Sequence, residues 1–419
     1  FGFDGAIYSD WEAVRDRTAA CKAGLDIEFP FYQKNYEKLV ADYHAGLLSD
    51  EELDACASRV LDLVYRIQEM KEKRQIKRTQ AERRALSKQL AEESIVLLKN
   101  DGALPLAKGG NIAVCGEYAS PMRCSLFAGG GSSMVKNDEH FFDLSALLRE
   151  RTGGEVKYEP AFWTKGIASN WQKPHRAFFD ASLSDTAIVC VGTGGDIEFE
   201  GGDRDSLRLP AVQEEMILEV ARRNRNTVVV VFAGSAIDMS AWKDEVSAIV
   251  WAGFCGEGGG EALADVLAGI VSPSGKLSET MPLSLESTPA YGSYCDALVA
   301  RYEEGLDVGY RYYDTYNIPV AFPFGHGLCY ARFAYSDLAA SVYGDSLTLQ
   351  FAIGNESDVG GKEIAQIYVR PLGGFVYRPE KELKAYEKVF VNSHESASVC
   401  VCLERSAFSY WSTATDGWK

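Results

Sequence analysis

The chain has 419 residues, of which 46% are hydrophobic and 25% are charged, which is enough for two or three folded domains and excludes a disordered chain. Asp and Glu outnumber Lys and Arg by 60 to 43, and the resulting net charge of -17 disfavours binding to nucleic acid or to an anionic membrane surface. No apolar run approaches the roughly 18 residues that a membrane-spanning helix needs.

The first 75 residues have the pattern of alternating strands and helices. A short strand-like run, residues 5–9, ends at Asp10, and a second apolar segment covers residues 23–30. Ser49 and Glu52 then have the spacing of a capping box. The following apolar residues recur at helical spacing, which predicts a helix: Leu53, Ala57, Val60, Leu61, Val64 and Ile67. Strand, connection, strand and helix together are typical of a β/α architecture.

A basic stretch follows this helix. Between residues 66 and 88 the sequence has nine basic and three acidic residues. Such runs are usually solvated connectors or exposed helix faces rather than polyanion sites. We interpret this stretch as the link between two domains, residues 1–75 and residues 76–332.

The second predicted domain contains four continuous apolar runs, each followed closely by a glycine. Continuous rather than alternating apolarity is typical of strands that are covered on both faces. Helical patterns at residues 212–221 and 261–267 lie after the second and fourth runs. We therefore predict an α/β sandwich with a mainly parallel sheet, whose strands include residues 112–115, 187–191, 227–232 and 248–251.

After residue 332 the hydrophobic pattern changes to a period of two. Leu347, Leu349, Phe351 and Ile353 alternate with polar or small residues, and residues 365–369 and 399–403 do the same. This alternation predicts an antiparallel β-sandwich over residues 333–419.

The ten cysteines are scattered through the chain. Cys115, Cys190, Cys400 and Cys402 lie inside apolar runs, where we expect each thiol to behave as a small buried hydrophobe. Unpaired thiols favour a cytoplasmic protein. No C-x-x-C pair is present and the five histidines are dispersed without a ligand pair at i, i+4 spacing, so we do not expect a zinc site.

Asp10 is the first candidate for chemistry. It directly follows a short strand, which is where β/α barrels carry their reactive groups, and the adjacent Trp11 offers a ring on which a sugar can stack. The alternative is an Asp that caps a turn at a strand end.

A loop after the apolar run 187–191 holds the second candidates. Open α/β sheets bind ligands at the carboxyl ends of their strands, and this loop offers four carboxylates with flanking glycines. It lacks the G-x-G-x-x-G spacing, and its charge would repel a phosphate. The alternatives are a loop that presents an acid and a solvated acidic loop; its carboxylates are Asp196, Glu198, Glu200 and Asp203.

Other glycine clusters and histidines give weaker signals. Residues 129–133 lack the ending of a phosphate-binding P-loop, and residues 256–260 are interpreted as the tightly packed start of a helix rather than an anion site. We expect His326 to be a hydrogen-bonded structural residue.

Several segments together resemble glycoside hydrolase family 3. Residues 2–11 (GFDGAIYSDW) are similar to the nucleophile segment of that family, and residues 91–106 are similar to the start of its second domain. Residues 200–204 (EGGDR) match its Glu-Gly-x-Asp-Arg pattern. Further matches in the same order are residues 24–30, 129–133, 272–277, 304–313, 322–327 and 381–388.

The resemblance implies a retaining β-glycosidase whose site lies between a barrel and an α/β sandwich, with a fibronectin type III-like domain at the end. Asp10 would be the nucleophile and Glu200 the acid/base, with Glu198 as its rival, and Trp11 would stack on the sugar. No metal or organic cofactor is implied. The implied substrate is a β-glucoside or an oligosaccharide, with β-xylosidase/α-L-arabinofuranosidase activity or a non-catalytic carbohydrate-binding role as alternatives.

The sequence departs from the family in its barrel. It supplies only the last part of a (β/α)8 barrel, and two β/α units cannot close an eight-stranded barrel. The β-sandwich also looks incomplete. We therefore expect the chain alone to have little or no activity, and expect a longer product of the gene, a second copy of the chain or a complementing barrel segment to complete the site.

Overall fold

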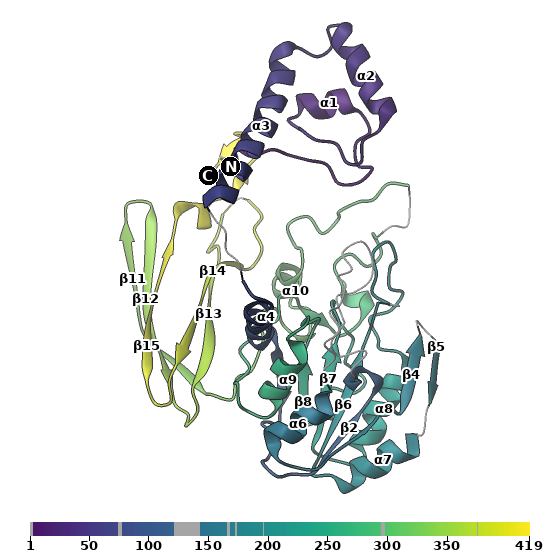
Figure 1. Ribbon diagram of the computed structural model, residues 1–419. Helices are drawn as coiled ribbons and strands as arrows, with labels where there is room; N and C mark the ends of the chain where they lie inside the picture. Colours follow the sequence, from purple (N-terminus) through teal and green to yellow (C-terminus); the bar gives the residue numbers. More distant parts are fainter. Residues whose placement is uncertain are drawn as a thin grey trace. The chain divides into compact units, whose positions relative to one another are not determined.

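The computed structural model describes residues 3–73, 78–120, 143–165, 168–171, 174–195, 197–294, 298–374 and 376–419. These residues form two compact units, Phe1–Thr79 and Gln80–Lys419 (Figure 1). Each unit is described by itself.

The first unit has three helices and one parallel β-bridge. The bridge joins Tyr8 to Ile27. The predicted capping box is confirmed, because the Glu52 amide donates to Ser49 Oγ and the Ser49 amide donates to Glu52 Oε2, at 3.2 and 2.9 Å. The helices are α1 (Arg17–Lys22), α2 (Gln33–His44) and α3 (Asp50–Lys73).

The core of this unit is small. Its buried hydrophobic residues are Cys21, Leu48 and Cys56, against which Leu39 and Leu53 pack. Large apolar side chains are at the same time exposed on both the bridge segments and α3: Ile7, Tyr8, Trp11, Phe31, Leu61, Val64 and Ile67. Taken alone, these residues bury little apolar surface.

The second unit is built on a six-stranded sheet in the order β1-β8-β7-β6-β2-β3. The sheet is parallel except for β1, which pairs antiparallel with β8. The four predicted apolar runs form its four central strands, and all four strands are buried at every position. The strands are β1 (Val96–Asn100), β2 (Ile112–Cys115), β3 (Val156–Glu159), β6 (Thr186–Gly192), β7 (Thr227–Phe232) and β8 (Ala248–Trp251).

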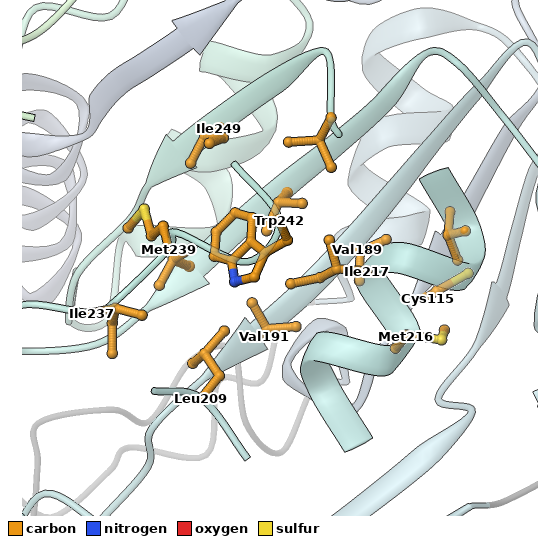
Figure 2. Packing of buried hydrophobic residues seen from close by; sticks show 14 of the residues in the cluster. Cys115, Val189, Val191, Leu209, Met216, Ile217, Ile237, Met239, Trp242 and Ile249 are labelled. Carbon is orange, nitrogen blue, oxygen red and sulfur yellow. The ribbon is translucent and has the colours of Figure 1, made fainter. Parts of the chain in front are cut away.

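Helices pack on both faces of this sheet, as the continuous apolar runs require. One face is covered by α4 (Gln80–Ser94), α6 (Leu144–Thr152) and α9 (Gly259–Leu267), and the other by α7 (Pro174–Leu183) and α8 (Ala211–Ala221). On the second face, the fully buried Trp242 lies among Val191, Met239 and Ile249 (Figure 2).

The outer edge of β1 is occupied by the chain segment around residues 326–328. The Leu328 amide donates to the Leu97 carbonyl at 2.8 Å, and His326 Nε2 lies 2.8 Å from the Leu98 carbonyl oxygen. The prediction of a hydrogen-bonded structural histidine is therefore confirmed. The remaining elements of this domain are η1 (Glu117–Ala119), β4 (Phe162–Lys165), β5 (Ala168–Trp171), β9 (Met281–Pro282), η2 (Leu285–Ser287), α10 (Tyr310–Tyr316) and β10 (Val320–Phe322).

The last part of the chain is a β-sandwich. One sheet has the order β11-β12-β15 and the other pairs β13 with β14, all antiparallel. The alternating residues predicted to face inward supply most of its buried core, which includes Ile353, Ala365, Val399 and Leu403. The elements are β11 (Phe333–Tyr343), β12 (Ser346–Asn355), β13 (Gly361–Val369), β14 (Glu382–Val391), β15 (Ser396–Leu403), η3 (Arg405–Ala407), β16 (Trp411–Ser412) and β17 (Gly417–Trp418).

The predicted fold class is confirmed for the α/β domain and the sandwich, whereas one local prediction needs correction. The basic stretch 66–88 contains the boundary between the two units, and its described residues are mostly helical, in α3 and α4. Cys400 and Cys402 are exposed rather than buried, because they alternate with the inward-facing Val399, Val401 and Leu403. The domain boundaries at residues 75/76 and 332/333 stay predictions.

Candidate active site

The carboxyl end of β6 is held firmly before the acidic loop begins. The Gln213 side chain on α8 bonds to both backbone groups of Gly192: it accepts from the amide at 2.8 Å and donates to the carbonyl at 2.9 Å. The Thr193 amide donates to the Phe232 carbonyl at the end of β7. A Cβ atom on Gly192 would lie 2.2 Å from that carbonyl oxygen, so only glycine fits. The loop therefore leaves the sheet from a fixed point.

Glu198 lies inside a dense hydrogen-bond network next to this point. Its Oε2 accepts from the Thr193 hydroxyl at 2.7 Å and from the Gly234 amide at 2.8 Å. Its Oε1 accepts from the Ser235 hydroxyl and from Arg204 Nη1, the latter at 3.3 Å. The Glu198 side chain is only 11% exposed. Each carboxylate oxygen thus accepts two hydrogen bonds.

Glu200 lies two residues further along and differs in its environment. It is exposed and lies in a turn, where Gly201 has a φ of +80° that favours glycine. Asp203, on the far side of this turn, is also exposed and accepts from the Tyr294 hydroxyl at 3.0 Å. The fourth predicted carboxylate, Asp196, lies outside the described residues.

Two further charged residues complete the electrostatics around Glu198. Arg204 Nη1 also donates to Ser235 Oγ at 2.9 Å and to the Ala236 carbonyl at 3.2 Å. Burial lowers the pKa of Arg204, although the charges of Glu198 and Glu279 oppose this effect. Burial raises the pKa of Glu279, and the nearby Glu198 charge raises it further. The cluster therefore holds one guanidinium between two glutamates.

Asp10 and Trp11 belong to the first unit, whereas the acidic loop belongs to the second. Asp10 is exposed and accepts a hydrogen bond from the Trp11 amide at 2.6 Å. The Trp11 ring is 66% exposed and stacks on Phe29, with ring centroids 5.4 Å apart and planes 9° apart. The aromatic face predicted beside Asp10 is thus present and accessible in this unit.

The segment before Asp10 is fixed by the buried Asp26, which pairs with the partly exposed Arg59. Asp26, whose side chain is fully buried, accepts from the Ile7 amide at 2.8 Å and pairs with Arg59 at 2.8 Å. Burial would raise the pKa of Asp26, but the hydrogen bonds from Arg59 and Ile7 outweigh it and lower the pKa. The strand that leads to Asp10 is in this way attached to α3.

The sequence did not reveal the partners of Glu198. Gly234 and Ser235 follow β7 and are far from Glu198 in sequence, and Glu279 lies further still. The one available signal was the Gly-Ser pair directly after an apolar run, at the sheet edge where loops converge.

The glycine cluster at residues 256–260 leads into α9, which begins at Gly259, and packs tightly as predicted, since a Cβ atom on Gly258 would lie 2.3 Å from the Lys88 amide nitrogen of α4. Residues 129–133 lie outside the described residues. Within the described part of the chain, no group of three or more His, Cys, Asp or Glu side chains could hold a metal ion. None of its helices combines the length and the apolar character needed to cross a membrane.

Two family models match the chain. The pattern described as the glycosyl hydrolase family 3 C-terminal domain matches residues 95–330, which is more than half of the chain, and a fibronectin type III-like domain matches residues 363–419. The chain belongs to glycosyl hydrolase family 3.

Relatives of this family 3 chain are known in sequence and structure. It is 38% identical to the thermostable beta-glucosidase B of Acetivibrio thermocellus over 99% of its own length and 55% of that protein, and 35% identical to an exo-alpha-(1->6)-L-arabinopyranosidase of Bifidobacterium longum over 100% and 56%. The crystal structure of a GH3 beta-glucosidase from Bifidobacterium adolescentis superposes with a TM-score of 0.90 at 34% identity, covering 100% of this chain and 61% of that one. The chain thus spans between half and two thirds of the length of these relatives.

Proposed function

We propose that this chain supplies the catalytic carboxylates of a retaining β-glycosidase that hydrolyses terminal non-reducing β-D-glucosyl residues. Asp10 attacks the anomeric carbon and forms a covalent glycosyl-enzyme. Glu200 protonates the leaving oxygen and then activates the water that releases the sugar. This reaction requires two carboxyl groups about 5–5.5 Å apart in the active protein.

The observation that carries the proposal is the place of Glu200. It is an exposed carboxylate in a turn beyond the carboxyl end of β6, the edge at which open α/β sheets bind ligands. The chain that holds it is similar along 99% of its length to a protein named as a beta-glucosidase.

Glu200 is a better acid/base than Glu198 on geometric grounds. Both oxygens of Glu198 already accept two hydrogen bonds each, which leaves no lone pair directed at a glycosidic oxygen. Glu200 lies at the exposed part of the turn, where a substrate can reach it. Enclosure by a bound sugar and the nearby nucleophile would keep this acid protonated.

Trp11 gives the sugar an aromatic platform beside the nucleophile. Its ring is exposed, and its stacking on Phe29 fixes the plane of the ring. The C–H face of a pyranose packs on such a ring with little loss of side-chain entropy, because the ring is already held.

A pentoside is the second candidate substrate, as for a β-xylosidase or an α-L-arabinofuranosidase. Its support is the relative named as an arabinopyranosidase, which matches the whole chain at 35% identity. A β-D-xylopyranoside differs from a β-D-glucopyranoside only in lacking the hydroxymethyl group, whereas an L-arabinoside also differs in the configuration of a hydroxyl group or in ring size. A non-catalytic carbohydrate-binding role is the third alternative.

Mechanism-based trapping tests the proposal. The protein, in the longest form that its gene provides, is incubated with a 2-fluoro β-glucoside that carries a good leaving group, and peptide mass spectrometry locates the adduct. We expect a 2-fluoroglucosyl ester on Asp10 and none in D10N. An adduct on another carboxylate would mean that the nucleophile is assigned wrongly, and an adduct only with a 2-fluoro xyloside would select the pentoside.

We further propose that the chain functions in a reducing compartment such as the cytoplasm. The support is that the eight described cysteines are all free thiols.

A further inference from the structure

Glu198 accepts four hydrogen bonds, yet the proposed chemistry does not use it. Its four donors come from three places in the fold: the end of β6, the end of β7 and the far side of the loop itself. They are Thr193, Gly234, Ser235 and Arg204. We call Glu198 with these four residues the Glu198 anchor.

The anchor encloses the turn that carries Glu200. Glu198 lies two residues before Glu200 and Arg204 lies four residues after it, and the two side chains are bonded to each other. Both are also bonded to Ser235 beyond β7. The backbone between Glu198 and Arg204, with Gly201 at a φ of +80°, is therefore a short turn whose two ends are both attached to Ser235 at the end of β7.

The anchor also depends on a close approach of the loop to β7. A Cβ atom on Gly234 would lie 3.4 Å from Glu198 Oε2 and 2.6 Å from the Phe254 ring. Because residue 234 is glycine, its amide can reach the carboxylate directly. The side chains of Glu198 and Arg204 are both only 11% exposed, so little water competes with the bond between these two side chains.

From this geometry we propose that Glu198 is a positioning residue, which holds the turn at residues 199–203 against β7 and so fixes where Glu200 presents its carboxyl group. The effect on catalysis rests on the proposed glycosidase function, whereas the positioning of the turn does not depend on it. The proposal assigns to the first glutamate of the Glu198-Phe199-Glu200 sequence a role distinct from acid/base catalysis.

The substitution E198Q tests the anchor directly. A carboxamide has one acceptor oxygen and one donor nitrogen, so at least one N–H of Gly234 or Arg204, or one hydroxyl, loses its acceptor. S235A removes one donor to Glu198 and one acceptor of Arg204 but keeps both charges, which provides a milder variant if E198Q does not fold. The matched control is D205N, which neutralises an exposed carboxylate of the same loop.

Hydrogen exchange of the chain, measured by mass spectrometry, is the first readout and needs no activity. Peptides that cover residues 197–206 and 233–236 are expected to exchange about tenfold faster in E198Q, less so in S235A, and unchanged in D205N. Peptides from the interior of β7 serve as the internal reference and should not change. Exchange of E198Q at the wild-type rate would overturn the proposal.

Kinetics of the longest gene product on an activated β-glucoside supply the second readout. A positioning role predicts that kcat falls in E198Q with little change in KM, and that added azide does not restore the rate. Azide should restore turnover in E200A, with a glucosyl azide as product. Azide rescue of E198Q would overturn the proposal by identifying Glu198 as the acid/base. If the wild-type protein hydrolyses no β-glucoside, the proposed function fails, and the exchange experiment still decides the anchor.

Discussion

Glu93 on α4 joins the α/β domain to the β-sandwich through two ion pairs, and its removal gives a testable stability change. Its carboxylate pairs with Lys362 on β13 and with Lys388 on β14, the latter at 3.0 Å. The hydrogen bond from Lys362 outweighs burial and, with Lys388, lowers the pKa of Glu93 from 4.5 to about 2. The perturbation that we consider is E93Q, which removes the charge and keeps the shape.

The magnitude can be bounded from the structure. Since one pKa unit corresponds to about 1.4 kcal/mol, the lowered pKa sets an upper limit of about 3 kcal/mol. The Glu93 side chain is 30% exposed, and its partners Lys362 and Lys388 are 35% and 21% exposed, so solvent screens both pairs. Two partly exposed pairs at up to about 1 kcal/mol each lead us to expect a loss of about 1–2 kcal/mol at neutral pH.

The pH dependence has a definite sign. Because the pKa is lower in the folded state, the contribution of Glu93 is complete above the ordinary value of 4.5 and is lost as the pH falls toward about 2. Urea unfolding followed by circular dichroism at neutral pH and at about pH 3 measures both points. The difference in unfolding free energy between wild type and E93Q should shrink at the lower pH.

The matched control is E92Q, one residue earlier on α4. Glu92 pairs with Lys88 on the same helix, and such a pair contributes about 0.3–0.5 kcal/mol. A penalty for E93Q that equals that of E92Q, or that does not change between the two pH values, would refute the reasoning.

Four further predictions follow from the packing and the ion pairs. W242A should lower the free energy of unfolding by about 3–5 kcal/mol in urea titrations, because the ring is fully buried. G192A should cost more stability than G153A in the same assay, because a Cβ atom at position 192 would clash with the Phe232 carbonyl oxygen. A Cβ atom at position 153 has no neighbour within 4 Å, so G153A should cost only the backbone strain of a φ of +72°, about 1 kcal/mol. D26N should cost about 1.5–3 kcal/mol in the same assay, because it removes the charge that accepts hydrogen bonds from the partly exposed Arg59 and from the Ile7 amide. This difference should shrink below pH 3.8, where the lowered pKa of Asp26 makes its contribution fade, and a constant penalty would contradict the assigned ion pair. Iodoacetamide should modify Cys400 and Cys402 of the folded protein, as read by mass spectrometry, but not the buried Cys115, whose pKa burial raises to about 12.

The central sheet could be predicted from the sequence because its strands are covered on both faces. Each of β2, β6, β7 and β8 is a short continuous apolar run, which is typical of strands covered on both faces. The edge strand β3 was missed, since only its first residue, Val156, is buried. β1 was missed because its apolar residues directly follow the helix α4 and were not separated from it by a turn signal.

The candidate site could be predicted only in part. The position of the acidic loop followed from the end of the apolar run at Val191, because a parallel sheet directs its loops to one edge. The different environments of Glu198 and Glu200 could not be predicted, since they depend on Gly234 and Ser235, which only the folded sheet brings near. The wrong expectation for Cys400 and Cys402 has a similar origin: in a strand with alternating burial, an apolar neighbour means that the next side chain faces outward.

The contacts along the outer edge of β1 have a consequence for self-association. An edge strand with unpaired carbonyl and amide groups is a template on which another molecule can add a strand. Here the carbonyls of Leu97 and Leu98 are already engaged by the Leu328 amide and the His326 ring. The segment at residues 326–328 therefore covers this edge of the sheet. We expect that replacing His326 would increase aggregation at high protein concentration before it unfolds the domain.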